Sequence, residues 1–305
     1  MTAMDETPLT DTLDAAYRHC WRIATSHYEN FTLGSWMLPK PLRRHIAAIY
    51  AFARTADDIA DEGDVPASER LARLRHWSEA LEECYRGRAR DPIFVALADT
   101  AEQFALPIVL FHNLLRAFAA DVQFAPFETF DDLVGYCRNS ADPIGRLILC
   151  LFGYRDAQRQ QLADRVCTGL QLANFWQDVS VDLPRGRVYF PLEDLRRFDC
   201  RVDQMRRAEF PDNLRQLMRF EVERSRALLS SGAELQSLVA PHLAREVRLF
   251  AGGGLAILRA IEKLDYNVLR TRPTVSKWTK VTLIMRAVIT VGTARPAVHR
   301  LAEGR

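Results

Sequence analysis

Apolar residues recur at intervals of three and four along nearly the whole chain, and this spacing gives an α-helix one buried face. The alternation typical of β-strands, bounded by turn residues, is almost absent. The 14 Gly and 14 Pro among 305 residues leave few helix-breaking positions, which favours long helices over a loop-rich β-sandwich. The sequence therefore predicts an all-α fold. We expect helices at residues 11–30, 42–62, 68–86, 92–104, 107–122, 128–138, 142–153, 156–180, 192–197, 211–231, 238–263 and 276–291.

The chain shows no internal repeat and no low-complexity linker. Turn-forming residues gather at 62–66 and 183–191, but both stretches are too short to separate domains. We therefore expect one domain that spans residues 1–305. Its ends, residues 1–12 and 293–305, are expected to be loose tails.

Charge and cysteine spacing exclude several classes of protein. The 41 basic and 39 acidic residues give a net charge of +2, and no basic stripe is interleaved with aromatic residues. This balance argues against a nucleic-acid-binding protein. The six cysteines stand singly, without a CxxC pair, so we expect reduced thiols and neither a zinc site nor a disulfide framework.

Hydropathy predicts a cytoplasmic protein. The first residues are polar and acidic, unlike a secretory signal. No apolar run approaches the roughly 18 residues that a membrane-spanning helix needs. The most apolar stretch, residues 281–294, is short and contains Arg286, so we expect a core helix there. Peripheral contact with the inner face of the membrane is the alternative.

The sequence Arg-Thr-Ala-Asp-Asp-Ile-Ala-Asp-Glu, residues 54–62, contains a first acidic motif. On a helix Asp57 and Asp61 share one face, and Arg54 lies on the same side. Stacked carboxylates repel one another unless a cation lies between them. The motif predicts either a solvated acidic helix end or a site for Mg²⁺, which prefers oxygen ligands and often bridges carboxylates to phosphates.

A second acidic motif follows at residues 171–182. Its polar residues Gln171, Asn174, Asp178 and Asp182 are three or four positions apart, which keeps them on one stripe of a helix. Such a stripe is either a solvated face or the lining of a cavity. Two such motifs on separate helices favour a bundle whose metal-lined end binds a diphosphate and assists its departure. The 16 Phe and 5 Trp are consistent with an apolar pocket beneath it.

Four segments in order resemble the squalene/phytoene synthase family. They are the first acidic motif, the stretch Tyr-Cys-Arg-Asn-Ser-Ala-Asp-Pro-Ile-Gly-Arg at 136–146, the second acidic motif, and Arg-Gly-Arg-Val-Tyr-Phe-Pro at 185–191. The resemblance runs from about residue 15 to 280. It implies an all-α, single-domain class I isoprenoid synthase helical bundle with a central apolar cavity. It also implies Mg²⁺ dependence and prenyl diphosphate substrates.

The resemblance also assigns site residues. The Mg²⁺ and diphosphate positions are Asp57, Asp61, Asn174, Asp178 and Asp182. The substrate-contacting positions beside them are Tyr50, Arg54 and Gln171. The kinked helix that lines the tail cavity carries Tyr136, Ser140, Ala141 and Gly145, although simple helix packing remains the alternative for Ser140 and Ala141.

Three basic or acidic residues near these motifs have two interpretations each. Arg185 and Arg187 either close over the diphosphate, for which the bidentate guanidinium is suited, or lie in a solvated loop. Asp121 is either an outer carboxylate of the site or an exposed helix end. The local pattern does not decide between them.

The chain also departs from the carotenoid-forming members of the family. A Ser-x-Ser-Phe stretch common in condensing members is replaced by His-Tyr-Glu-Asn-Phe at 27–31. Gly254 lies near a position that is tyrosine in carotenoid-forming relatives, and Gln177 occupies a position that is often arginine. With the run Gly-Gly-Gly at 252–254, these features resemble one bacterial branch of the family, the hydroxysqualene synthases of hopanoid biosynthesis.

This branch implies a diphosphate-releasing lyase that acts on presqualene diphosphate. The carbocation rearranges and is captured by water, which gives hydroxysqualene for squalene formation. We expect Mg²⁺ and no nicotinamide, with coupling to a presqualene diphosphate synthase and a downstream reductase. Glu29 and Asn30 are predicted to hold the water, although Glu29 could simply pair with a basic residue at the surface.

Two other functions remain open. One is a prenyltransferase that condenses farnesyl diphosphate head to head into presqualene diphosphate, squalene or phytoene, against which the missing Ser-x-Ser-Phe argues. The other is a non-catalytic assembly protein of the same fold. Loss of acidic-motif carboxylates would mark such a protein, and none is lost.

Overall fold

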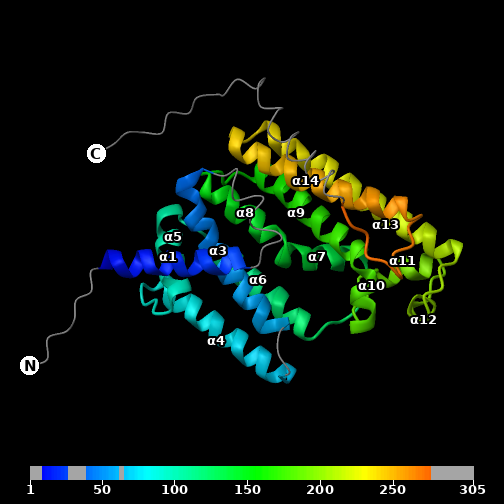
Figure 1. Cartoon of the computed structure of the whole chain (residues 1–305), viewed down its shortest axis with the longest axis horizontal. Coiled ribbons are helices and arrows are strands. Elements are labelled where there is room, and N and C mark those ends of the chain that lie inside the picture. The colour runs from blue at the N-terminus through cyan, green and yellow to red at the C-terminus, as the bar shows by residue number, and fades with distance from the viewer. Residues whose placement is uncertain (1–8, 27–38, 62–64, 276–305) are drawn as a thin grey trace, which may run out of the picture.

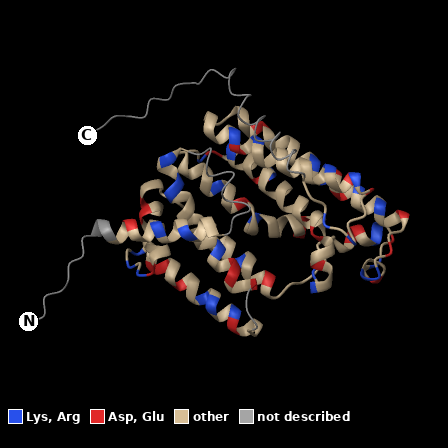
Figure 2. Ribbon diagram, in the orientation of Figure 1, with Lys and Arg blue, Asp and Glu red and all other residues tan. Residues whose placement is uncertain are grey.

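The computed structural model describes residues 9–26, 39–61 and 65–275, and in these ranges the chain forms α-helices and short 3-10 turns without a strand. Figure 1 shows the helices packed as one bundle, with the blue N-terminal helix on one side and the yellow and orange C-terminal helices on the other. Acidic and basic residues are interspersed over most helices (Figure 2). The predicted all-α fold is confirmed.

The first five helices that the structure describes lie between residues 9 and 122. α1 packs against α3 and α5, while α4 crosses α3, α5 and α6. Asp91 caps α5 by accepting a hydrogen bond from the Ile93 amide at 2.8 Å, and Pro92 occupies the first turn, where its missing N–H costs nothing. The bounds are α1 Leu9–Ser26, α3 Lys40–Asp61, α4 Ala67–Tyr85, α5 Pro92–Phe104 and α6 Ile108–Val122.

The C-terminal half is organised around α9, which contacts α8, α13 and α14. Thr129 and Asp132 form a capping box at the start of α7, and the Asp156 side chain caps α9. The bounds are α7 Phe130–Ser140, α8 Asp142–Leu151, α9 Ala157–Gln177, α10 Val179–Asp182, η1 Leu183–Arg185, α11 Leu192–Arg197, α12 Val202–Arg206, α13 Asp212–Gly232, η2 Ala233–Ser237 and α14 Pro241–Lys263.

The structure differs from the sequence prediction at several boundaries. α1 begins at Leu9, inside the segment expected to be a loose tail. The helix expected at 156–180 ends at Gln177, where Asp178 leaves helical geometry. α12 was not predicted, because five residues are too few to show a helical period. The helix expected at 276–291, the stretch 281–294 and the C-terminal tail lie outside the described residues.

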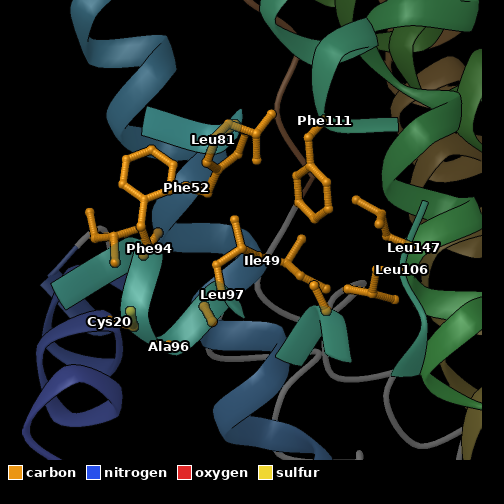
Figure 3. Close-up of a cluster of buried hydrophobic side chains, with 14 of the residues drawn as sticks. Cys20, Ile49, Phe52, Leu81, Phe94, Ala96, Leu97, Leu106, Phe111 and Leu147 are labelled. Atoms are coloured by element: carbon orange, nitrogen blue, oxygen red, sulfur yellow. The ribbon is translucent and has the colours of Figure 1, made fainter. Parts of the chain in front are cut away.

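Three apolar cores lie within the described helices, and aromatic contacts mark two of them. In the first, Phe52 of α3 lies between Phe94 of α5 and Phe111 of α6, with ring centroids 6.0 Å and 5.1 Å away (Figure 3). In the second, Trp176 of α9 stacks on Phe190 and donates a hydrogen bond to the Ser225 hydroxyl at 2.8 Å. Because α3 and α9 each contribute to a core, both helices are held firmly enough to position side chains elsewhere along their length.

Candidate active site: an acidic site above an apolar cavity

An apolar cavity of about 360 Å³ lies where α3, α8, α9, η2 and α14 meet. Most of its lining is hydrocarbon, and Tyr50, Cys167 and Glu246 are the lining side chains that carry a polar or ionisable group. The pocket that the sequence predicts is therefore present. The lining consists of Ile46, Ile49, Tyr50, Ala53, Ile144, Gly145, Ile148, Leu149, Ala163, Val166, Cys167, Leu170, Leu235, Leu243, Glu246, Val247 and Phe250.

α3 and α9 connect this cavity to the two acidic motifs. On α3 the lining residues reach Ala53, and the first acidic motif starts at the next residue, Arg54. On α9 the lining reaches Leu170, and the second acidic motif starts at Gln171. Both helices therefore carry an apolar wall in one section and a polar stripe in the section that follows. The sequence spacing alone predicts this change of character, because each polar stripe continues an apolar helix.

In the first acidic motif, Arg54 binds two carboxylates. Its guanidinium donates to Asp57 at 3.2 Å and lies 2.5 Å from an oxygen of Asp58. The three side chains are between a quarter and a half exposed, so they lie at the surface of the site. Arginine is the cation that the stacked carboxylates require. The hypothesis that Arg54 contacts substrate stays a prediction.

In the second acidic motif, Asp178 stands at the break between α9 and α10. Its carboxylate accepts hydrogen bonds from Arg272, one of them at 3.3 Å from Nη2. The neighbouring Gln177 is buried and donates to the carbonyl of Pro273 at 2.7 Å, which holds the segment that carries Arg272. Gln177 therefore has a positioning role that the sequence did not reveal.

Asn174 is exposed and Gln171 is half-buried, one turn apart on α9. Asp182, the last residue of α10, is more enclosed: burial, together with the negative charge of Asp178, raises its pKa to about 6. A carboxyl of this kind changes protonation readily when a cation approaches.

Arg187 contacts both acidic motifs, because its backbone amide donates to the Asp182 carbonyl at 3.1 Å while its side chain reaches Asp61. Its Nη2 lies 2.8 Å from a carboxylate oxygen of Asp61 and 3.5 Å from the backbone carbonyl of Asp121. Arg187 is half-buried, whereas Arg185 is exposed. The structure thus separates the two arginines that the sequence could not distinguish. Arg187 lies in the site and Arg185 on the loop surface.

Asp121 is a third acidic component of this site. It accepts hydrogen bonds from the Tyr136 hydroxyl at 2.9 Å and 3.0 Å. Burial, helped by the charges of Asp61 and Asp57, raises the pKa of Asp121 to about 6, although the Tyr136 hydrogen bond and Arg187 lower it. Burial also raises the pKa of Tyr136 well above its ordinary value. The second interpretation of Asp121, an exposed helix end, is therefore wrong, because the residue is enclosed and faces the first acidic motif.

The expected kink lies at Ala141, between α7 and α8, with φ −112° and ψ −47°. Gly145, one turn further, lines the cavity, and a Cβ there would meet the Cys167 sulfur at 2.6 Å. An alanine at this position would therefore require the Cys167 side chain to move, since α8 approaches α9 closely here. Tyr136 lies beside Asp121 rather than on the cavity wall. The Ser140 hydroxyl is buried, with no hydrogen-bond partner in the described part of the chain.

The donor set fits a hard divalent cation. In the described ranges, no three or more His, Cys, Asp or Glu side chains converge on one point, because the acidic motifs lie in two rows with arginines between them. Mg²⁺ takes oxygen ligands, and it is commonly bound by one or two carboxylates plus substrate phosphates. Two facing rows suit that binding mode better than a closed protein cage. The oxygen donors that could hold such ions are Asp57, Asp61, Asn174, Asp178 and Asp182.

Two predicted residues cannot be placed. Glu29 and Asn30, assigned to the water, lie outside the described residues. In contrast, the structure adds two residues that the sequence reasoning overlooked, Arg272 and Glu246. Arg272 is 94 positions from its partner Asp178, and no local pattern signals that contact. Glu246 did leave a signal, since it lies on the apolar stripe that contains Leu243 and Phe250.

A helical bundle with an apolar cavity beneath two aspartate-rich motifs is the architecture of an isoprenoid synthase. Residues 24–279 match the family model of squalene/phytoene synthases, and the chain belongs to that family. Among curated relatives, a phytoene synthase from Arthrospira platensis is 30% identical and aligns with 87% of this chain and 90% of its own length. A phytoene synthase from Mycobacterium tuberculosis is also 30% identical, over 86% of this chain and 84% of the relative.

Solved structures agree with this assignment. The squalene synthase HpnC from Alicyclobacillus acidocaldarius is 41% identical, with a TM-score of 0.81 over 87% of this chain and 99% of that protein. A dehydrosqualene synthase is 25% identical, with a TM-score of 0.82 over 92% of this chain and 98% of that protein. Both alignments span nearly the whole bundle, so the expected isoprenoid synthase fold is confirmed.

Proposed function

We propose that this protein is a hydroxysqualene synthase that converts presqualene diphosphate into hydroxysqualene and diphosphate. The observation that carries the proposal is the 41% identity to the squalene synthase HpnC, against 30% to the phytoene synthases. The departures at residues 27–31, 177 and 254 from the carotenoid-forming pattern support the same assignment.

The chemistry divides between the two parts of the site. The carboxylates Asp57, Asp61, Asp178 and Asp182 and the amide of Asn174 would hold Mg²⁺, which neutralises the charge that develops on the departing diphosphate. Arg187 is placed to orient the diphosphate, since its guanidinium already reaches between the acidic motifs. The apolar cavity below excludes bulk water, which a carbocation requires in order to rearrange before capture.

Gly254 supports a product other than a carotenoid. It is buried, and a Cβ there would lie 2.8 Å from Leu229 and 3.0 Å from Leu170. A tyrosine at this position would require the side chains of Leu229 and Leu170 to move. The packing that accommodates the aromatic ring in carotenoid-forming relatives is therefore not available without rearrangement.

A second candidate function is head-to-head condensation of farnesyl diphosphate. The observation in its favour is that curated relatives at about 30% identity are phytoene synthases. A condensing enzyme needs room for two prenyl diphosphates, and both candidates use the same acidic site. The first proposal, a hydroxysqualene synthase, includes peripheral contact with a membrane. It also includes coupling to a presqualene diphosphate synthase and to a reductase. No helix in the described ranges is long and apolar enough to cross a bilayer.

The deciding experiment supplies presqualene diphosphate and farnesyl diphosphate in separate reactions, with Mg²⁺ and without nicotinamide, and identifies the products by mass spectrometry. Hydroxysqualene from presqualene diphosphate supports the proposal. Presqualene diphosphate made efficiently from farnesyl diphosphate would replace it with the condensing function. A folded protein that releases no diphosphate from either substrate would be a non-catalytic relative. The Asp57→Asn variant is the negative control for each reaction.

A further inference from the structure

Glu246 is the carboxyl group on the wall of the apolar cavity. It lies on α14, on the same helical face as Leu243, Val247 and Phe250, all of which line the cavity. The residue is only 4% exposed, and neither of its side-chain oxygens has a hydrogen-bond partner in the described part of the chain. Within residues 9–26, 39–61 and 65–275 no ion pair involves Glu246 either, although Arg245 and Arg248 are close in sequence.

A buried carboxyl without a partner is costly, because its hydration is lost and nothing replaces it. Burial raises the pKa of Glu246 to about 8, with no neighbouring charge to oppose the change. Both the acid and the carboxylate are therefore accessible near neutral pH, the range in which a proton acceptor is most effective. The packing of the fold does not use this group, so its two oxygens are available to a ligand in the cavity.

The cavity can hold that ligand beside a substrate. Its volume of about 360 Å³ is far above the roughly 10–15 Å³ that one water molecule requires. A water molecule remains in an apolar space only where polar atoms bind it. Tyr50 and Cys167 are the other lining residues with polar side-chain atoms, and among the described lining residues Glu246 offers two oxygens that no described group binds.

We propose that the Glu246 carboxyl binds a single water molecule inside the cavity and that this water captures the carbocation. The inference rests on the proposed function. In the capture step the water oxygen forms a C–O bond with the cationic carbon, and one O–H bond of the water breaks. The proton passes to the Glu246 carboxylate, so that a cation, a carboxylate and water give a neutral alcohol and a carboxylic acid. Glu246 returns the proton to solvent when the product leaves.

The assignment differs from the sequence prediction, which placed the water at Glu29 and Asn30. In both cases one water molecule reacts in an otherwise dry cavity. The residue that holds it determines whether the cation becomes an alcohol or loses a proton and becomes a hydrocarbon. Glu246 would therefore control product identity without taking part in the release of diphosphate.

The test measures diphosphate release and product distribution in the same reaction for Glu246→Leu, Glu246→Gln and the wild-type protein, with presqualene diphosphate and Mg²⁺. Leu243→Met, a change of shape without charge on the same wall, is the matched control, and Glu29→Ala is measured in parallel. We expect diphosphate release within about threefold of wild type in Glu246→Leu, while the ratio of alcohol to hydrocarbon falls at least about tenfold. Glutamine binds water but accepts no proton, so the ratio of alcohol to hydrocarbon in Glu246→Gln should lie between the ratios of the wild type and of Glu246→Leu.

Two outcomes would overturn the assignment. One is an unchanged ratio of alcohol to hydrocarbon in Glu246→Leu and Glu246→Gln. If the ratio falls in Glu29→Ala alone, the water is bound by the segment that contains Glu29 and Asn30. The other is a high-resolution crystal structure of the wild-type protein that shows no water within hydrogen-bond distance of Glu246. A wild-type protein that forms no alcohol at all would instead contradict the proposed function, and the crystallographic result would still report whether Glu246 binds water.

Discussion

The acidic site and the apolar cavity both contain carboxyl groups, but they surround them with opposite environments. At the acidic site Asp57, Asp61 and Asp178 each contact a guanidinium and remain partly exposed. In the cavity Glu246 is buried and contacts no guanidinium of the described residues. A carboxylate that is paired and hydrated stays ionised at little cost in free energy, so it can bind cations. A buried carboxyl without a partner is present partly as the neutral acid. The difference assigns charge binding to one region and proton transfer to the other.

The largest effect is expected at the acidic site. Asp57→Asn or Asp178→Asn removes a carboxylate that cation and diphosphate binding needs, so turnover should fall at least about 100-fold. Helical content by circular dichroism should stay near that of the wild type, because both side chains are partly exposed. Asp131→Asn, an exposed aspartate in the first turn of α7, is the control. Turnover close to wild type in both variants would remove these residues from the site.

Arg187 gives the next largest effect. Arg187→Lys keeps a positive charge but loses the planar fork that reaches Asp61, so kcat/KM should fall about tenfold. Arg185→Lys, two residues away and exposed, should leave kcat/KM within about twofold. Equal effects in the two variants would mean that the loop contributes only net charge, and the structural distinction between the two arginines would have no functional meaning.

A substitution in the cavity wall should change the stability of the protein, although it alters no charged group. Gly145→Ala places a Cβ 2.6 Å from the Cys167 sulfur, and overpacking of this kind costs about 1–3 kcal/mol of unfolding free energy. Cys167→Ala should relieve part of that loss, which a double-mutant cycle in urea measures. Gly135→Ala has open space around it and should be stabilising. Additive losses in the cycle would show that the two side chains do not meet.

The smallest effect concerns pH. The folded pKa of Glu246, about 8, lies above its ordinary value of 4.5, so the folded protein binds more protons than the unfolded chain between these values. Its contribution is therefore present below pH 4.5 and is lost as pH rises through 8. Glu246→Gln should therefore lose less unfolding free energy than the wild type as pH rises from 5 to 9, which urea unfolding at each pH measures. Parallel curves would show that Glu246 is already partnered.

Much of the fold was predictable because long helices repeat their apolar spacing many times. α3 and α14 carry clear apolar stripes, whereas α9 is buried on several sides, and the first acidic motif continues the helix of α3. The break of α9 at Asp178 was not predictable, because its cause is the local backbone conformation rather than the sequence pattern. The resemblance supplied the roles of the acidic motifs, which spacing alone left open.

Contacts between distant segments account for what the sequence missed. Arg187 and Asp61 are 126 positions apart, and Arg272 reaches Asp178 only because Gln177 binds the Pro273 carbonyl. Glu246 could have been noticed as a charged residue on an apolar stripe, but its lack of a partner is visible only in three dimensions. Pairing is a property of the assembled bundle, and one sequence does not contain it.

The arginines between the acidic motifs also determine how a substrate approaches. In the described part of the site, the six carboxylates of Asp57, Asp58, Asp61, Asp121, Asp178 and Asp182 outnumber the four guanidiniums of Arg54, Arg185, Arg187 and Arg272, so this end of the bundle keeps a negative formal charge. A bare diphosphate anion would meet a repulsive electrostatic potential there. An anion that arrives with its own divalent cations meets an attractive one. The association rate should therefore rise with Mg²⁺ concentration and depend on ionic strength, even where the chemical step is unchanged.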